Sequence, residues 1–136
     1  FKTEKADGAR PRIQYVCADI GRMPLAKYDL VITPFVLDCF GDAALSLLIP
    51  KLAQALSRRG SWIFTDFHIP EGRTQPLARL LIRFVYFCFN RFCDLQRNQL
   101  PDFPLFFRSA QLDMSAEYFF LRGLVVTRVY RPAEVP

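Results

Sequence analysis

The sequence has very few histidines and no paired cysteines, and these shortages exclude several kinds of site. Its 136 residues include one histidine, His68, and four cysteines, Cys17, Cys39, Cys88 and Cys93, with no Cys-x-x-Cys pair. A structural zinc ion needs four such ligands at regular spacings. We therefore expect no metal site, and we interpret the cysteines as small buried residues of a protein in a reducing, cytoplasmic compartment.

No apolar run is both long and uncharged enough for a membrane span. The most apolar stretch, "LARLLIRFVYFCFNRFCDL", is interrupted by Arg79, Arg83 and Arg91. Spanning a bilayer takes about twenty largely uncharged residues, and central arginines are costly. We interpret residues 73–98 as one long amphipathic helix. Its polar face carries Arg79, Arg83, Asn90, Asp94 and Arg97.

The bulk composition is that of a single globular domain. Hydrophobic residues make up 51% and charged residues 23%, with a net charge of +5. The densest basic stretch lies inside an apolar helix and not in an exposed aromatic patch, so we do not expect nucleic acid as a partner. The opening "FKTEKADGARPR" is polar, lacks an initiator methionine and has no signal-peptide pattern. This opening leads us to expect a fragment or a processed chain.

Strand and helix patterns alternate along the first half. Apolar alternation predicts a strand over 13–18, and the continuous run of "YDLVITPF" is typical of a strand buried on both faces of a parallel sheet. A helix is then predicted from Asp42 as N-cap to Gly60 at C′, kinked or split at Pro50. "SWIFTDF" reads as the next short strand.

The second half predicts helices and then an antiparallel hairpin. After the helix at 73–98, a shorter helix follows Pro101, and two strands are joined around Gly123. The order predicts an α/β three-layer domain with a mixed sheet. We expect one domain over 1–136, made of a polar segment, a βαβ-type core, the long helix, and a helix with the terminal hairpin. These parts cover 1–12, 13–70, 73–98 and 100–132.

This order of elements resembles the C-terminal half of a class I S-adenosylmethionine-dependent methyltransferase, a Rossmann-like fold. "YVCADI" resembles the third strand of that fold, and "YDLVITPFVLDCF" resembles the fourth strand with its loop. "RRGSWIFTDF" resembles the approach to the fifth strand, and "FFLRGLVVTRVYR" resembles the terminal hairpin. The family's glycine-rich turn is absent, because the six glycines stand alone.

The resemblance implies S-adenosylmethionine as cofactor and places its binding residues. An acid at the position of Asp19 accepts a hydrogen bond from the adenine amino group, and the backbone N–H of Ile20 meets the ring. Thr33, Pro34, Phe35 and Asp38 would line the pocket under the methionine and the sulfonium. From the residues alone, Asp19 is as well explained as the cap of a turn, and Asp38 as a helix N-cap.

Two side chains are candidates for proton transfer to or from the acceptor. His68 follows a predicted strand and suits a general base, although a loop histidine without a role is the plainer interpretation. Asp66 lies where ligands bind beyond strand ends. The aromatic rings of "FVYFCFNRF" are either core or a lid over a small apolar or aromatic acceptor.

The missing first strands of the family would leave the strand at 28–35 with a naked edge. We expect the strand at 13–18 to move across and pair there, a homodimer to form through the edge, or another segment to cover it. The leading hypothesis is methyl transfer by the complete domain, with the fragment itself inactive. The alternative is a non-enzymatic interaction module whose arginine-bearing helix docks on a membrane surface or a partner. A third hypothesis, a dehydrogenase remnant, is disfavoured by the hairpin.

Overall fold

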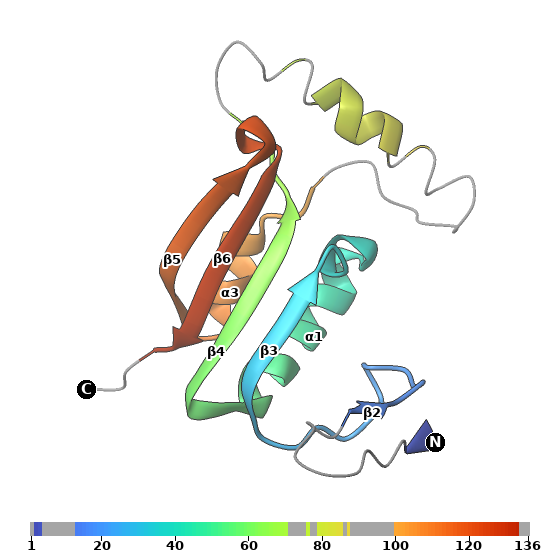
Figure 1. Ribbon diagram of the computed structural model, residues 1–136, viewed down its shortest axis with the longest axis vertical. Helices are drawn as coiled ribbons and strands as arrows, with labels where there is room; N and C mark the ends of the chain where they lie inside the picture. The colour runs from blue at the N-terminus through green and yellow to red at the C-terminus, as the bar shows by residue number, and fades with distance from the viewer. Residues whose placement is uncertain are drawn as a thin grey trace.

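The computed structural model describes residues 2–3, 13–70, 76, 79–85, 87 and 100–133. A four-stranded mixed sheet in the order β3-β4-β6-β5 forms its centre (Figure 1). β3 (Tyr28–Pro34) and β4 (Leu56–Phe67) run parallel, because α1 (Asp42–Ala55) carries the chain back between them. β6 (Val125–Pro132) is antiparallel to β4 and to β5 (Leu112–Phe120). The predicted mixed sheet with a terminal antiparallel hairpin is confirmed.

The strand predicted over 13–18 is wrong in length and in partner. It is reduced to β2 (Gln14–Tyr15), which pairs antiparallel with β1 (Lys2–Thr3) in a separate two-stranded sheet. Ile13 and Tyr15 are exposed, so the apolar alternation has no layer to pack against. β2 does not cross to β3, and in the described chain β3 pairs only with β4. The naked edge of β3 therefore remains.

The first long helix ends earlier than predicted. α1 stops at Ala55, and Leu56 already has extended backbone angles. Arg58 and Arg59 therefore lie inside the twelve-residue β4 and not in the last helical turn. The charge pattern was misleading here because burial of Leu56 against the core outweighs the helix dipole's preference for cations at its end.

Gly60 is required for a reason other than the predicted helix cap. A Cβ at this position would come within 3.0 Å of the Ser57 carbonyl oxygen and 3.1 Å of the Tyr28 carbonyl oxygen. The pairing of β3 with β4 is irregular here, since Tyr28 faces Leu56 whereas Leu30 faces Ser61. A glycine lets the two backbones approach at this irregularity.

The start of α1 also differs from the prediction. Gly41 is the N-cap, and Asp42 is the first helical residue, where its charge still favours the dipole. Pro50 lies within the helix without splitting it. The helix predicted after Pro101 is confirmed as α3 (Phe103–Ser109), and the Asp102 carboxylate caps it by accepting from the N–H of Leu105 at 3.3 Å.

The hairpin turns through the short 3-10 helix η2 (Leu121–Gly123), as the sequence predicted. Gly123 has a φ of 89°, and a Cβ there would meet Pro70 Cβ at 3.0 Å. Only glycine satisfies both the backbone angle and the close approach.

The long helix predicted over 73–98 is described in part. Residues 76, 79–85 and 87 are helical, and the remaining positions, with Arg91, Asn90, Asp94 and Arg97, lie outside the described residues. Ile82 is buried, whereas Leu80, Phe84 and Phe87 are more than 60% exposed beside Arg79 and Arg83. The docking of this helix on a membrane surface or partner stays a prediction. Among the described helices, none is long and apolar enough to cross a membrane.

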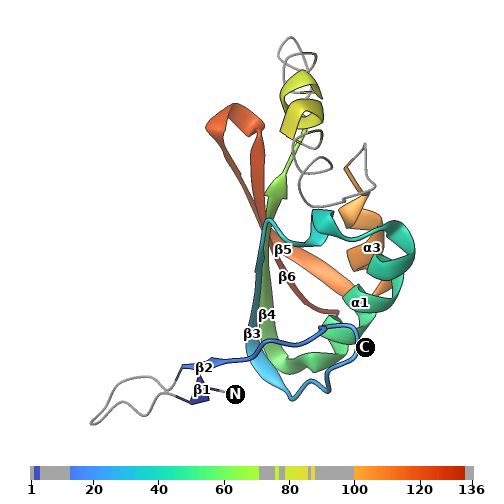
Figure 2. The same cartoon turned by 90° about the vertical axis from the view of Figure 1, so that its right-hand side faces the viewer.

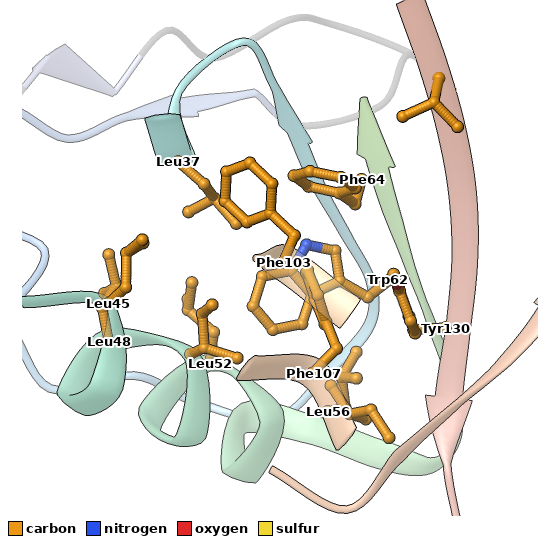
Figure 3. Close-up of a cluster of buried hydrophobic side chains, with 13 residues drawn as sticks. Leu37, Leu45, Leu48, Leu52, Leu56, Trp62, Phe64, Phe103, Phe107 and Tyr130 are labelled. Atoms are coloured by element: carbon orange, nitrogen blue, oxygen red, sulfur yellow. The ribbon is translucent and has the colours of Figure 1, made fainter. Parts of the chain in front are cut away.

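The core lies between the sheet and the two helices α1 and α3 (Figure 3). Phe107 of α3 is its centre: its ring stacks on Tyr130 at 4.0 Å and meets the rings of Trp62 at 4.8 Å and Phe64 at 5.2 Å. The helix α1 contributes leucines at helical spacing, among them Leu45, Leu48 and Leu52. The apolar periodicity of the sequence therefore predicted this side of the core correctly.

No helix among the described residues covers the opposite side of the sheet. Figure 2 shows α1 and α3 on the same side of the strands. Along β4, buried Trp62, Phe64 and Asp66 alternate with partly exposed residues that point away from the helices. We call this second side, which carries Ile32, Ile63, Thr65, Tyr118, Thr127 and Val129, the bare face. Of the three layers expected from the sequence, the described residues form two.

Candidate functional site

The carboxyl ends of the parallel strands β3 and β4 form the candidate site. Thr33 is buried there, and its hydroxyl accepts a hydrogen bond from the indole N–H of Trp62 at 2.8 Å. The backbone N–H of Phe35 donates to the Thr65 carbonyl oxygen at 2.8 Å, which extends the ladder past Pro34. The chain then turns sharply, because Phe35 has a φ of 49°. This turn explains why Pro34 and Phe35 follow the apolar run of β3: the strand ends there, and the ring of Phe35 becomes exposed.

The ring of Phe35 lies at the surface of this edge. It is 44% exposed and sits 5.2 Å from the ring of Phe67 at the end of β4. A 3-10 helix, η1 (Leu37–Cys39), follows and carries Asp38, which is 6% exposed. Asp38 is not the N-cap of α1, so that alternative is wrong. Its carboxylate Oδ1 lies 3.6 Å from the thiol sulfur of Cys39, which donates to it.

Asp66 is the most buried charged group of the site. It is 0% exposed, its Oδ1 accepts from the N–H of Phe67 at 2.8 Å, and its Oδ2 has no partner within the described residues. Burial and the negative charge of Asp38 raise the pKa of Asp66 to about 7, and the N–H groups of Phe67 and Asp38 act in the opposite direction. Near neutral pH this carboxyl is therefore partly protonated.

His68 follows β4 and is fixed in one orientation. Its Nδ1 lies 2.9 Å from the Gly123 carbonyl oxygen, and its ring packs against Phe119 at 5.2 Å. Because a carbonyl oxygen only accepts, Nδ1 carries the hydrogen of the neutral ring, and Nε2 is the nitrogen that accepts a proton.

Asp19 and Ile20 are held elsewhere. The Asp19 carboxylate accepts from the N–H of Gly21 at 2.8 Å and lies 3.4 Å from Arg22, so it caps a turn, as the plainer interpretation predicted. The ammonium of Lys51 donates to the carbonyl oxygens of Ile20, Gly21 and Met23 at 2.7–3.0 Å.

The hydrogen bonds of Lys51 hold Asp19 and Ile20 away from the other residues of the predicted cofactor site. Lys51 lies nine residues after Asp42, about 14 Å along α1 at 1.5 Å per residue, whereas Asp38 precedes the helix. The structure therefore brings Thr33, Phe35, Asp38 and Asp66 to one edge and leaves Asp19 and Ile20 away from it. Sequence reasoning missed Lys51, and no local signal distinguishes it from a solvent-facing helical lysine.

A hollow near Lys51 is lined by residues that lie away from the strand ends. It has a volume of about 370 Å³ and is lined by Leu25, Ala26, Lys27, Lys51, Gln54 and Ala55. Both lysines are engaged: Lys27 donates to the Gln54 carbonyl oxygen at 2.6 Å, which caps the end of α1. We therefore interpret this hollow as packing around two structural lysines.

The described residues hold no group of three or more potential metal ligands. Cys17 and Cys39 are exposed and in no disulfide of the described residues, which contradicts their interpretation as buried apolar residues. Cys88 and Cys93 lie outside the described residues.

Two comparisons agree on the relatives of this chain. No family model matches the sequence. Acetylserotonin O-methyltransferase of Mus musculus is 32% identical over 76 residues, which is 56% of this chain and 20% of that protein. The Rattus norvegicus enzyme of the same name is 32% identical over 75 residues, or 55% and 17% of the two chains. The chain thus spans about a fifth of the curated relatives that it matches.

Solved structures match over most of the chain. Mitomycin 7-O-methyltransferase MmcR aligns with a TM-score of 0.70 at 14% identity, covering 90% of this chain and 34% of the other. Human N-acetylserotonin methyltransferase in complex with SAM aligns with a TM-score of 0.67 at 18% identity, covering 94% and 36%. CalO1, a calicheamicin-biosynthesis methyltransferase in its SAH-bound form, gives 0.69 at 17%, covering 95% and 37%. In fold, and over 76 residues in sequence, the chain is therefore similar to part of these S-adenosylmethionine-dependent methyltransferases.

Proposed function

We propose that the complete protein to which this chain contributes transfers a methyl group from S-adenosylmethionine to a hydroxyl group of a small aromatic or apolar acceptor. The likeness to acetylserotonin O-methyltransferase over 76 residues carries the proposal. It is supported by methyltransferase folds that align with 90–95% of this chain. The oxygen acceptor follows the O-methyltransferase names of these relatives, and the small acceptor follows the compounds in those names, acetylserotonin and mitomycin.

The described residues fit the cofactor only in part. S-adenosylmethionine supplies an activated methyl group on a positive sulfonium when it is bound. An exposed aromatic ring and a carboxylate suit such a cation, and Phe35 and Asp38 offer both at the strand ends. The adenine-side residues Asp19 and Ile20 are held apart from them by Lys51. The sequence also has no glycine-rich turn for the methionine end.

We therefore expect the isolated chain not to bind S-adenosylhomocysteine, the product form of the cofactor. Isothermal titration of the 136-residue chain should give no saturable heat at ligand concentrations up to the millimolar range. The complete protein, titrated in parallel as the matched control, should bind. Micromolar binding by the isolated chain would show that the strand ends suffice for the site and would contradict this expectation.

We propose His68 as the general base that takes the proton from the hydroxyl group of the substrate. Its Nε2 is the basic nitrogen of the neutral ring, and the Gly123 carbonyl oxygen holds the ring in place. Asp66 is the second candidate, since its raised pKa suits proton exchange near neutrality. Asp66 is fully buried, however, so His68 is the better placed of the two.

The function is tested with the complete protein, methyl-labelled S-adenosylmethionine and a panel of hydroxylated aromatic compounds. Label should appear on oxygen in at least one of them. His68→Gln should lower kcat by about 100-fold, because general base catalysis is typically worth that much or more. The control variant Leu105→Ala, at an exposed side chain of α3 that retains His68, should leave kcat unchanged. Label on nitrogen or carbon alone would contradict the oxygen acceptor, and an unchanged kcat in the His68 variant would remove its role.

A further inference from the structure

A turn at residues 19–23, which we call the Asp19 turn, is held against α1 by the side chain of Lys51. Its ammonium donates to the carbonyl oxygens of Ile20 at 3.0 Å, Gly21 at 2.8 Å and Met23 at 2.7 Å. A lysine has three N–H donors, and this turn takes all three. In the described chain no strand of the main sheet precedes the turn, because β2 is part of a separate two-stranded sheet. The hydrogen bonds of Lys51, with the packing of Ile20 against the core, therefore determine where the Asp19 turn lies.

The Asp19 turn is also ordered from within. The Asp19 carbonyl oxygen accepts from the N–H groups of Arg22 at 3.0 Å and Met23 at 2.9 Å. The Asp19 carboxylate Oδ1 accepts from the N–H of Gly21 at 2.8 Å, and a Cβ on Gly21 would come within 3.2 Å of that oxygen. These bonds tie the Asp19 side chain to its own backbone. Once Lys51 fixes the backbone of the turn, the direction of the carboxylate is fixed as well.

The Asp19 carboxylate keeps room for a further donor. An ionised carboxylate offers about four acceptor sites, and the N–H of Gly21 occupies one of them. The ion pair with Arg22 joins side chains that are 62% and 90% exposed, so it is weak and easily exchanged. Capping the turn and binding a ligand are therefore compatible roles for Asp19.

We propose that Lys51 is a positioning residue for the adenine ring of S-adenosylmethionine, acting through the Asp19 turn. The inference rests on the proposed function, because only a protein that binds this cofactor has an adenine ring to place. The adenine amino group is a hydrogen-bond donor, and Asp19 is the acid expected to accept from it. Such a bond weakens steeply with distance and angle, so it needs a turn that is held in place. Lys51 does not touch the ring, since its donors are all used.

The distance between the Asp19 turn and the strand ends is compatible with this role. S-adenosylmethionine is an extended molecule that carries its adenine and its sulfonium on opposite sides of the ribose. The strand ends and the Asp19 turn therefore need not be adjacent to serve one cofactor molecule.

Lys27 offers a comparison within the same protein. It lines the same hollow as Lys51, and its ammonium donates to the carbonyl oxygens of Gln54 at 2.6 Å and Leu56 at 3.4 Å. Both acceptors lie at the end of α1, and neither belongs to the Asp19 turn. Both lysines thus satisfy backbone carbonyl oxygens, but only Lys51 holds the segment that carries the acid. Replacing Lys27 should therefore affect stability alone.

Discrimination between two ligands by the complete protein tests the proposal. Isothermal titration measures the Kd of S-adenosylhomocysteine and of its analogue whose purine lacks the 6-amino group. The wild type should bind the first at least about tenfold more tightly, as expected for a hydrogen bond to a charged group. Lys51→Met should reduce this ratio to less than about threefold, whereas the matched control Lys27→Met should keep the wild-type ratio. Because the ratio compares two ligands on one protein, any loss of folded protein cancels.

Hydrogen exchange of the 136-residue chain tests the attachment of the turn without any ligand. The N–H groups of Gly21, Arg22 and Met23 should exchange at least about tenfold faster in Lys51→Met and at the wild-type rate in Lys27→Met. Lys51→Gln keeps two donors on a shorter side chain, so its ratio and exchange rates should fall between those of wild type and Lys51→Met. This variant decides the test if Lys51→Met does not fold.

The outcomes separate this inference from the proposed function. If the complete wild-type protein does not bind S-adenosylhomocysteine, the proposed function is wrong and the role of Lys51 falls with it. If it binds but does not discriminate, or if Lys51→Met keeps the ratio, the role of Lys51 in placing adenine is wrong while the proposed function stands. An equal loss of discrimination in the two lysine variants would assign the effect to a general loosening of α1 and would also overturn the inference.

Discussion

Replacing Asp66 by asparagine should stabilise the chain above pH 7 and change its stability much less at pH 4. The carboxyl is fully buried, and its pKa is raised from 3.8 to about 7. The folded state therefore holds a proton that the unfolded state releases above pH 4. Its stabilising contribution is complete below the unfolded value and is lost as the pH rises through about 7. At 1.36 kcal/mol per pKa unit, the loss amounts to about 4 kcal/mol.

Urea unfolding of both proteins at pH 4.5 and pH 8.5, at one protein concentration, measures this effect. The free energy of unfolding of the asparagine variant, relative to wild type, should rise by about 3 kcal/mol between the two pH values. The variant Asp113→Asn, on an exposed carboxylate of β5, is the control and should show no such rise. If Asp66→Asn differed from wild type by the same free energy of unfolding at both pH values, the pKa of the buried carboxyl would not be raised. The carboxyl would then be ionised beside a group that balances its charge.

Truncating Phe107 to alanine should cost about 4 kcal/mol of unfolding free energy at any pH. The ring is 0% exposed and contacts three other rings, those of Trp62, Phe64 and Tyr130. Removing it takes away the transfer free energy of a large side chain and leaves a cavity between α3 and the sheet. A loss of this size is a large part of the stability of a small domain.

The control for this variant lies on the same helix. Leu105 is 62% exposed, so Leu105→Ala should change the free energy of unfolding by less than about 0.5 kcal/mol. Urea unfolding followed by Trp62 fluorescence reports both variants, because the indole packs against Phe107. If the two alanine variants lost similar amounts, the aromatic cluster would not be the centre of the core.

Local sequence patterns predicted an element correctly where the same residues also determine how that element packs. A short helix was predicted after Pro101, and in the structure Asp102 caps it as α3 while Phe103 and Phe107 are buried one turn apart. The terminal hairpin was predicted from Gly123, where the φ of 89° and the close approach of Pro70 require glycine. The end of α1 was predicted wrongly because two arginines and a glycine imitate a helix terminus, whereas here they belong to a long strand.

The candidate site was predictable in its composition and only partly in its arrangement. Thr33, Phe35, Asp38 and Asp66 lie at or just past the ends of predicted strands, and parallel pairing of β3 with β4 brings those ends together. Asp19 was placed at the end of a strand over 13–18, but the strand there is only Gln14–Tyr15. The rule that ligands bind beyond strand ends therefore did not apply to Asp19. Its position depends on Lys51, which binds three carbonyl oxygens across about thirty residues of sequence.

The sequence by itself determined which residues could be buried, where the chain must turn, and which chemical groups follow the strands. These properties depend on side-chain chemistry and on neighbours within a few positions. Only the tertiary structure decided that burial beside Asp38 raises the pKa of Asp66 and that the Gly123 carbonyl oxygen fixes the His68 ring. It also decided that the described helices α1 and α3 cover only one face of the sheet. Those properties arise from contacts between segments that are distant in the chain, and no local pattern encodes them.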